Sequence, residues 1–202
     1  MPTLYDVKPA FQNLLRPVAA GLVKLGATAN MVTIAAAALS IVTGVLIARH
    51  HAFPGIFWLM PAALFLRMAL NAIDGMMARE FGQKSALGMY LNELTDVISD
   101  AALILPFALM PQFPASGVVL FALLATLTEY AGALGVMAGG ARRYDGPMGK
   151  SDRALALGVI AALLALGVTF AMIGAYLFPA LAALCALTII NRIRAGMKDA
   201  AA

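Results

Sequence analysis

The chain has 202 residues, of which 62% are hydrophobic and 12% charged, and its mean hydropathy is +0.90. Typical globular domains carry about 25% charged residues, so this composition cannot cover a water-facing surface and predicts a protein embedded in a lipid bilayer. It excludes a soluble enzyme, a disordered region and a disulfide scaffold, since Cys185 is the only cysteine. The net charge of +4 is not gathered into the dense basic face that nucleic-acid binding requires, so we expect no nucleic-acid partner.

An amphipathic pattern precedes the first long apolar stretch. Apolar residues recur at helical spacing from Val7 to Leu25, with basic and amide residues between them. This pattern predicts a helix that lies in the membrane interface and ends at Gly26. We therefore divide the chain into an amphipathic juxtamembrane helix over residues 1–28 and a six-helix transmembrane domain over residues 29–202.

Six further apolar stretches each approach the ~20 residues that a helix needs to cross ~30 Å of hydrocarbon. They cover about 30–49, 55–78, 87–110, 115–138, 153–174 and 178–195, and four prolines are expected to mark turns between them: Pro54, Pro111, Pro114 and Pro179. The apolar residues run continuously instead of alternating, which favours helices over a transmembrane β-barrel. The predicted fold class is an all-α integral membrane protein with six transmembrane helices preceded by the N-terminal interfacial helix.

The positions of the basic residues orient these spans. Of the fourteen Lys and Arg residues, all but Arg49 and Arg67 fall at the span ends that share a side with both termini. Cytoplasmic loops are enriched in Lys and Arg, so this bias predicts a multi-pass protein of the cytoplasmic (inner) membrane with both termini in the cytoplasm.

Charged and amide side chains fall inside three predicted spans, where each charge costs about 2.5–3.5 kcal/mol on insertion scales and therefore indicates function. The set comprises Arg67, Asn71 and Asp74 in the second span, Asn92, Glu93, Asp96 and Asp100 in the third, and Glu129 in the fourth. Spacings of three and four residues put each set on one helix face. We expect the second and third spans to turn these faces toward each other around a pocket open to the cytoplasm. We also expect Arg67 to pair with Asp100, Glu129 or both.

The two faces contain one motif, which reads Asn71-x-x-Asp74-Gly75-x-x-Ala78-Arg79, then eight residues, then Gly88-x-x-x-Asn92-x-x-x-Asp96. It resembles the signature of the CDP-alcohol phosphotransferase (CDP-alcohol phosphatidyltransferase) family, D-x-x-D-G-x-x-A-R-x8-G-x-x-x-D-x-x-x-D, with the same spacing throughout. The resemblance extends to the interfacial helix, to Thr28-x-Asn30-x-x-Thr33 at the start of the first span, and to the six spans. It therefore covers essentially the whole chain.

This resemblance implies a reaction and a set of site roles. Family members transfer a phosphatidyl-type group from a CDP-linked lipid such as CDP-diacylglycerol to an alcohol and release CMP, in phospholipid biosynthesis. They use Mg²⁺ or Mn²⁺ held at four acidic positions, and they are commonly homodimers. Carried over, Asp74 and Asp96 are cation ligands, and Asp96 is also the candidate catalytic base. The CDP site would be lined by Gly75, Ala78, Arg79 and Gly88.

Asn71 and Asn92 depart from the family signature. An amide oxygen can bind a metal ion but brings no charge, so the aligned positions keep two negative charges instead of four. Glu93 and Asp100 lie on the same stripe as Asp96 and could replace the missing ligands. Three interpretations are open: an active variant with rearranged ligands, a member with reduced or altered chemistry, and an inactive relative that only binds a nucleotide-lipid. A transporter is disfavoured, because we find no internal repeat in the sequence.

Basic residues at the fifth and sixth spans form a candidate acceptor site. Lys150, Arg153 and Arg192 lie at span ends, and family members with phosphorylated acceptors place basic residues in these regions. We therefore expect these three to bind an anionic group on the acceptor. Arg142, Arg143 and Arg194 are interpreted as cytoplasmic anchors that attract anionic lipid.

Overall fold

The structure, a computed structural model, describes the backbone of residues 4–200 and the side chains from residue 11 onward. The side chain of Val7, on which the predicted amphipathic pattern begins, lies outside the described residues. Between residues 4 and 200 the chain is helical, without strands, which confirms the all-α prediction. The helices are α1 (Leu4–Lys24), α2 (Ala29–His50), η1 (Pro54–Trp58), α3 (Leu59–Glu80), α4 (Ala86–Ile104), η2 (Leu105–Leu109), α5 (Ala115–Met137), α6 (Lys150–Ala165) and α7 (Gly174–Ala200).

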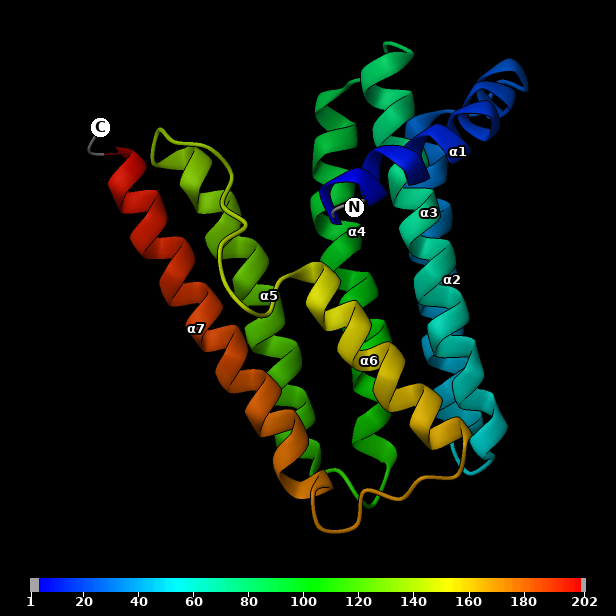
Figure 1. Ribbon diagram of the computed structural model, residues 1–202, viewed down its shortest axis with the longest axis vertical. Helices are drawn as coiled ribbons and strands as arrows, with labels where there is room; N and C mark the ends of the chain where they lie inside the picture. Colours follow the sequence, from blue (N-terminus) through cyan, green and yellow to red (C-terminus); the bar gives the residue numbers. More distant parts are fainter. Residues whose placement is uncertain (1–3, 201–202) are drawn as a thin grey trace.

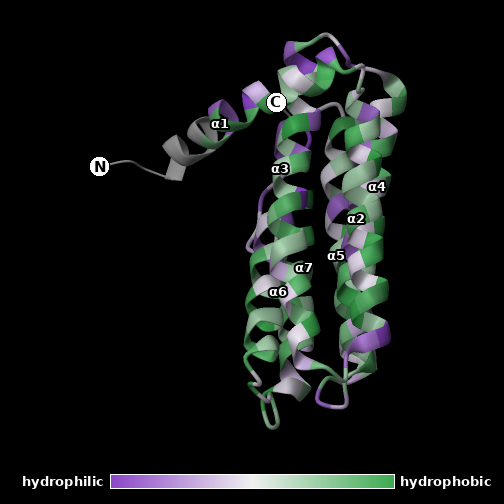
Figure 2. Ribbon diagram, turned by 90° about the vertical axis from the view of Figure 1, so that its right-hand side faces the viewer, coloured by the Kyte–Doolittle hydropathy of each residue, from purple (hydrophilic) through white to green (hydrophobic). Residues whose placement is uncertain are grey.

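Helices α2 to α7 run up and down in one bundle, and α1 lies across one end of it (Figure 1). Helix α5 packs along α7, and α2 packs along both α3 and α4. Hydrophilic residues gather mainly at the two ends of the bundle and on α1, while hydrophobic residues dominate between them (Figure 2). This distribution is that of a bundle whose solvent is the bilayer.

Four helical stretches are long and apolar enough to cross a membrane: Ala29–His50, Pro54–Glu80, Ala115–Met137 and Gly174–Ala200. Helix α4 has 19 residues and contains the buried acids Asp96 and Asp100. Helix α6 has 16 residues and therefore rises only ~24 Å. Membrane crossing by α4 and α6, and with it the count of six spans, stays a prediction.

The expected helix over 153–174 is wrong beyond Ala165. Gly167 adopts a positive φ of 81°, a conformation that glycine reaches without steric cost. The N–H groups of Gly167 and Val168 donate to the carbonyls of Leu164 and Leu163, at 2.9 Å each, which is the Schellman pattern that ends a helix. A hydrophobic stretch did not reveal this end, because the residues after it remain apolar.

The expected turn at Pro179 is also wrong, because α7 begins at Gly174 and continues through this proline. The proline ring packs against α5 at Gly117, where an added Cβ would lie 2.9 Å from Pro179 Cδ. The missing side chain of Gly117 makes room for the ring between the helices. Near the start of a helix, one lost backbone hydrogen bond is offset by this packing.

Helix α1 ends at Lys24, and Gly26, the predicted terminating residue, follows in the turn with a φ of +82°. One face of α1 packs on α3: the rings of Phe11 and Phe65 are 6.4 Å apart, and Arg16 Nε lies 2.9 Å from Glu80 Oε2. Ala19 is fully buried in this contact. Helix α1 is therefore fixed to the end of α3 that carries the motif.

Six phenylalanines from η1, η2, α5, α7 and the connecting turns form an aromatic cluster at the opposite end of the bundle. They are Phe57, Phe107, Phe113, Phe121, Phe170 and Phe178, all buried, with neighbouring ring centroids 5.1–6.1 Å apart. These spacings suit tilted and edge-to-face aromatic contacts. The aromatic cluster holds the far helix ends together and leaves the other half of the bundle to the polar residues.

Candidate active site

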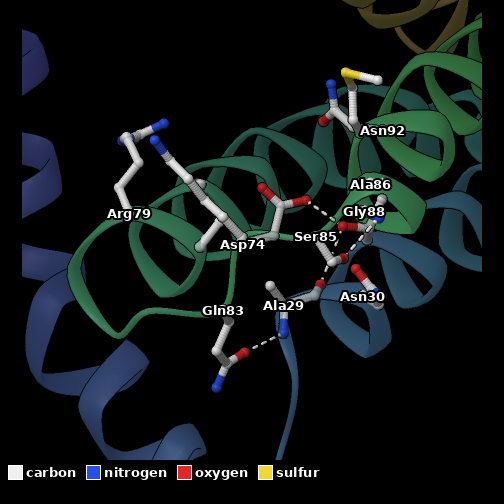
Figure 3. Close-up of a pocket in the computed structure, with 14 residues that line it drawn as sticks. Ala29, Asn30, Asp74, Arg79, Gln83, Ser85, Ala86, Gly88 and Asn92 are labelled. Atoms are coloured by element: carbon white, nitrogen blue, oxygen red, sulfur yellow. Dashed lines mark hydrogen bonds between the residues drawn. The ribbon is translucent and has the colours of Figure 1, made fainter.

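The motif lines a cavity of about 630 Å³ between α2, α3 and α4, called the first cavity below. Six motif residues border it: Asp74, Gly75, Ala78 and Arg79 from α3, and Gly88 and Asn92 from α4. The start of α2 and the turn over residues 83–86 complete the wall (Figure 3). The polar faces of α3 and α4 therefore meet around one shared cavity.

Local hydrogen bonds fix the wall of the first cavity. Ser85 caps α4 by accepting from the N–H of Gly88 at 2.9 Å. Gln83 Oε1 accepts from the N–H of Ala29 at 2.6 Å, which ties the turn to the first residue of α2. Gly88 permits the close approach of the helices, since a Cβ there would lie 2.8 Å from Asn30 Oδ1. The sequence reasoning missed Gln83, whose role depends on a contact across 54 residues.

Asp74 is buried in the first cavity, with 6% of its surface exposed. Its Oδ2 lies 2.7 Å from the hydroxyl oxygen of Thr33, which donates the hydrogen bond. Gly75 lies beside the Arg79 guanidinium, because a Cβ on Gly75 would meet Arg79 Nη1 at 3.1 Å. Thr33 thus orients the carboxylate, and Gly75 leaves room for the arginine.

Replacing Thr33 by Val is expected to reduce the rate of CMP release by about 10- to 100-fold, the usual effect of removing a group that orients a ligand or catalytic side chain. The residue keeps its shape but no longer donates to Asp74. The measurement is the initial rate of CMP release by purified protein. Thr126→Val is the matched control, because the Thr126 hydroxyl donates to Ala122 of its own helix at 3.1 Å. Equal rates for the two variants would refute the role of Thr33.

A second cavity of about 390 Å³ lies between α3 and the start of α6. Its polar lining consists of Arg67, Asn71, Lys150 and Ser151. Asn71 therefore lines a different cavity from Asp74, although both residues belong to the same motif.

Asp96 is buried, with 6% of its surface exposed, and lines neither cavity. Its Oδ1 accepts from Arg67 Nη2 at 3.0 Å, and its Oδ2 forms an ion pair with the Lys150 ammonium. Both of these cations line the second cavity, whereas Asn92, one turn before Asp96, lines the first. Asp96 is therefore connected to the first cavity through its helix neighbour Asn92 and to the second cavity through its two cationic partners.

Deeper in the bundle, buried acids and arginines form a continuous network. Arg67 Nη1 lies 2.7 Å from Asp100 Oδ1, which confirms the expected pair. Glu129 pairs instead with three other arginines: Arg142 at 2.8 Å, Arg153 at 2.9 Å and Arg192 at 3.5 Å. Arg153 also holds Asp100, at 2.8 Å. Each charge in this network thus has a partner of opposite sign, as a low-dielectric interior requires.

Interpreting Arg142 as a surface anchor is wrong. Its side chain is 17% exposed and lies between Glu129 and Glu93, with which it forms a second ion pair. The connection over residues 138–149 is irregular, so no periodicity indicates where Arg142 points. The neighbouring Arg143 pairs with Asp145 and Asp199, and its guanidinium lowers the pKa of Asp145.

The three residues expected to bind the acceptor lie in different surroundings. Lys150 lines the second cavity, and Arg153 and Arg192 line neither cavity. The latter two are 1% and 2% exposed. Arg192 donates to the carbonyl oxygens of Thr128 and Asp145, in addition to its pairing with Glu129. Direct contact with an acceptor is therefore open to Lys150, whereas the two arginines are enclosed.

The donor chemistry of the first cavity suits one hard cation. Among the residues that the structure describes, no three His, Cys, Asp or Glu side chains converge as a metal-binding group. Asp74 and Asn92 offer oxygen donors to the same cavity, and Asp96 follows Asn92 by one turn on α4. Mg²⁺ is commonly held by one or two carboxylates together with substrate phosphates and water. A single divalent cation fits these residues, and a four-carboxylate centre does not.

Residues 27–190 match the family model described as CDP-alcohol phosphatidyltransferase, so the chain belongs to this family. It is accordingly an enzyme of phospholipid synthesis that transfers phosphatidyl groups. Among curated proteins it is similar to the inner membrane protein YnbA of Escherichia coli (strain K12), with 53% identity over 157 residues and 78% of each chain covered.

The fold is also that of solved structures of phosphatidylinositol phosphate synthase (PgsA1) from Mycobacterium tuberculosis. The complex of PgsA1 with manganese and citrate has a TM-score of 0.70 and 20% identity, over 90% of this chain and 88% of that one. The structure of PgsA1 with CDP-DAG bound has a TM-score of 0.66 and 21% identity, over 91% and 92%.

Proposed function

We propose that the protein transfers the phosphatidyl group of a CDP-linked lipid, CDP-diacylglycerol, to an alcohol and releases CMP, with the donor in the first cavity and the acceptor in the second. The observation that carries this proposal is the placement of Asp96, one turn beyond Asn92 of the first cavity and ion-paired with Arg67 and Lys150 of the second. The fold shared with CDP-DAG-bound PgsA1 supports a lipid donor of this kind.

The first cavity is the proposed donor site. Gly75, Ala78 and Gly88 line it with little side-chain bulk, with Arg79 beside Gly75 and Asn30 beside Gly88 as polar groups for a nucleotide. Arg79 can hold a phosphate oxygen, because a guanidinium matches phosphate geometry. These four residues therefore keep the CDP-binding role that the resemblance implied.

A divalent cation, Mg²⁺ or Mn²⁺, would be held by Asp74, Asn92 and Asp96. When bound, such a cation neutralises a pyrophosphate and polarises the phosphorus under attack. Glu93 and Asp100 are not retained as ligands, because they are not motif positions and arginines engage both carboxylates. Asp96, which Arg67 and Lys150 also engage, is retained because it is the motif position one turn beyond Asn92. Asn71 is not retained either, since it lines the second cavity.

The second cavity is the proposed acceptor site. The acceptor hydroxyl gives its proton to the Asp96 carboxylate, its oxygen bonds to the lipid-side phosphorus, and the bond from that phosphorus to CMP breaks. Lys150 would contact an anionic group on the acceptor. Arg153 and Arg192 would stabilise this site without contacting the acceptor, through ion pairs with Asp100 and Glu129.

The similarity to an E. coli inner membrane protein supports the same location for this chain. The bias of Lys and Arg toward one set of span ends supports a multi-pass topology with both termini and the active site facing the cytoplasm. We retain the division into an interfacial helix over 1–28 and a catalytic domain over 29–202. We also retain the homodimer, which the mass of the purified protein in nanodiscs would test.

The decisive experiment incubates purified protein with CDP-diacylglycerol, Mn²⁺ and a panel of alcohols, phosphorylated alcohols included, and measures CMP. We expect CMP release that requires both the lipid and one class of alcohol. Tight binding of CDP-diacylglycerol without CMP release for any alcohol would favour the alternative function, a binding protein for nucleotide-lipids.

A further inference from the structure

We infer that the site binds one divalent cation, and that the Lys150 ammonium supplies, beside Asp96, the positive charge that a second cation would bring. This inference rests on the proposed function, because it concerns the same donor and acceptor cavities. It arises from a mismatch between the number of acidic residues in the motif and the number of cations around them.

The motif carries half of the negative charge that four carboxylates would bring. Four carboxylates carry four negative charges and can balance two divalent cations. Asn71 and Asn92 leave two negative charges, on Asp74 and Asp96. Arg67 and the Lys150 ammonium already pair with Asp96, so one divalent cation more than balances the two charges, and a second would remain uncompensated in a site with little exposure to water.

Glu93 and Asp100 do not replace the missing metal ligands. Glu93 is paired with Arg142, and Asp100 is held between Arg67 and Arg153. Moving Glu93 toward a metal would break an ion pair of Arg142, and moving Asp100 would break ion pairs of Arg67 and Arg153, in a network with little exposure to water. Each arginine would keep one acidic partner instead of two. The two acids that could have restored the missing charges are thus already committed to the deeper network.

Lys150 places a positive charge directly beside Asp96. It is the first residue of α6, and the preceding turn is fixed by the Gly149 N–H, which donates to Asp152 Oδ2 at 2.9 Å. The Lys150 ammonium forms an ion pair with Asp96 Oδ2, and the positive end of the α6 dipole adds to the local potential. An ammonium is a compact point charge, so it can fill the electrostatic place of a cation. This charge is part of the chain and needs no ligand set of its own.

The test is a count of bound Mn²⁺ on the full chain in nanodiscs, by electron paramagnetic resonance of free Mn²⁺ during titration. We expect one Mn²⁺ per chain for the wild type. Asn71→Asp with Asn92→Asp should still bind one, because Lys150 remains. Adding Lys150→Met to that pair should give two Mn²⁺, with dipolar broadening between them. Two Mn²⁺ on the wild type or on the double variant, or one on the triple variant, would overturn the inference.

A single substitution at Lys150 tests the same inference in a chain that keeps Asn71 and Asn92. Lys150→Met should tighten Mn²⁺ binding at least roughly tenfold, because a nearby positive charge is removed. Lys150→Arg should keep wild-type affinity. Lys24→Met is the control, since Lys24 ends α1 and lines neither cavity. An unchanged dissociation constant for folded Lys150→Met would contradict the inference.

The count is made without turnover, so it separates this inference from the proposed function. A chain that binds one Mn²⁺ and never releases CMP contradicts the function alone. A chain that releases CMP and binds two Mn²⁺ contradicts the inference alone.

Discussion

Replacing Asp74 by Asn is expected to reduce the rate of CMP release by about a thousandfold. Asp74 is the one carboxylate among the described residues that line the first cavity. A catalytic cation contributes several kcal/mol of transition-state stabilisation, and each ~1.4 kcal/mol is a factor of ten in rate. The variant keeps the shape of the side chain and an oxygen that can accept from Thr33, so the loss should come from charge.

Asp199→Asn is the matched control for this prediction. Asp199 is half-exposed near the end of α7 and pairs with Arg143, away from both cavities. We expect its rate to stay within about twofold of the wild type, since exposed ion pairs contribute little. A rate for Asp74→Asn within tenfold of the wild type would show that Asp74 does not hold the cation.

Replacing Arg153 by Met is expected to lower the free energy of unfolding by about 3–5 kcal/mol, the usual cost of breaking a buried ion pair from one side. Arg153 is 1% exposed and holds Asp100 and Glu129 together. Its removal leaves both carboxylates with one fewer partner in the centre of the bundle. Thermal unfolding in a constant detergent would register the loss as a lower midpoint temperature.

Arg194→Met provides the control for Arg153, because Arg194 lies exposed on the same basic end of α7. Its midpoint should stay within the error of the measurement. Arg153→Lys should fall between the two, since an ammonium keeps the charge but lacks the planar fork that reaches two acids. If Arg153→Met and Arg194→Met unfold at the same temperature, the buried network does not stabilise the fold.

The features that the sequence predicted well are those set by local spacing. The end of α1 just before Gly26 follows from one residue in a left-handed conformation. The pair between Arg67 and Asp100 follows from two antiparallel helices that each carry an isolated charge, because an unpaired charge in a bilayer is untenable. Spacing in the motif also placed Asp74 and Asn92 on facing sides of one cavity.

The features that it did not predict depend on contacts between distant segments. Arg142 lies in an irregular connection, and its partners Glu93 and Glu129 come from two other helices. Lys150 lies at a cavity, whereas Arg153 and Arg192 are enclosed. This difference depends on the residue at which α6 begins, and hydropathy locates a helix end only to within a few residues. Pro179 stays helical because Gly117, on another helix, leaves space for its ring.

The aromatic cluster at the far end of the bundle has a consequence for the membrane itself. A row of ionised side chains through a bilayer invites leakage of protons and small ions, which would dissipate the gradient across that membrane. The packed phenyl rings of Phe57, Phe107 and Phe178 offer such ions no polar group to bind. The cluster therefore closes the far end of the bundle with apolar side chains, and the buried charges are confined to the half that carries the motif.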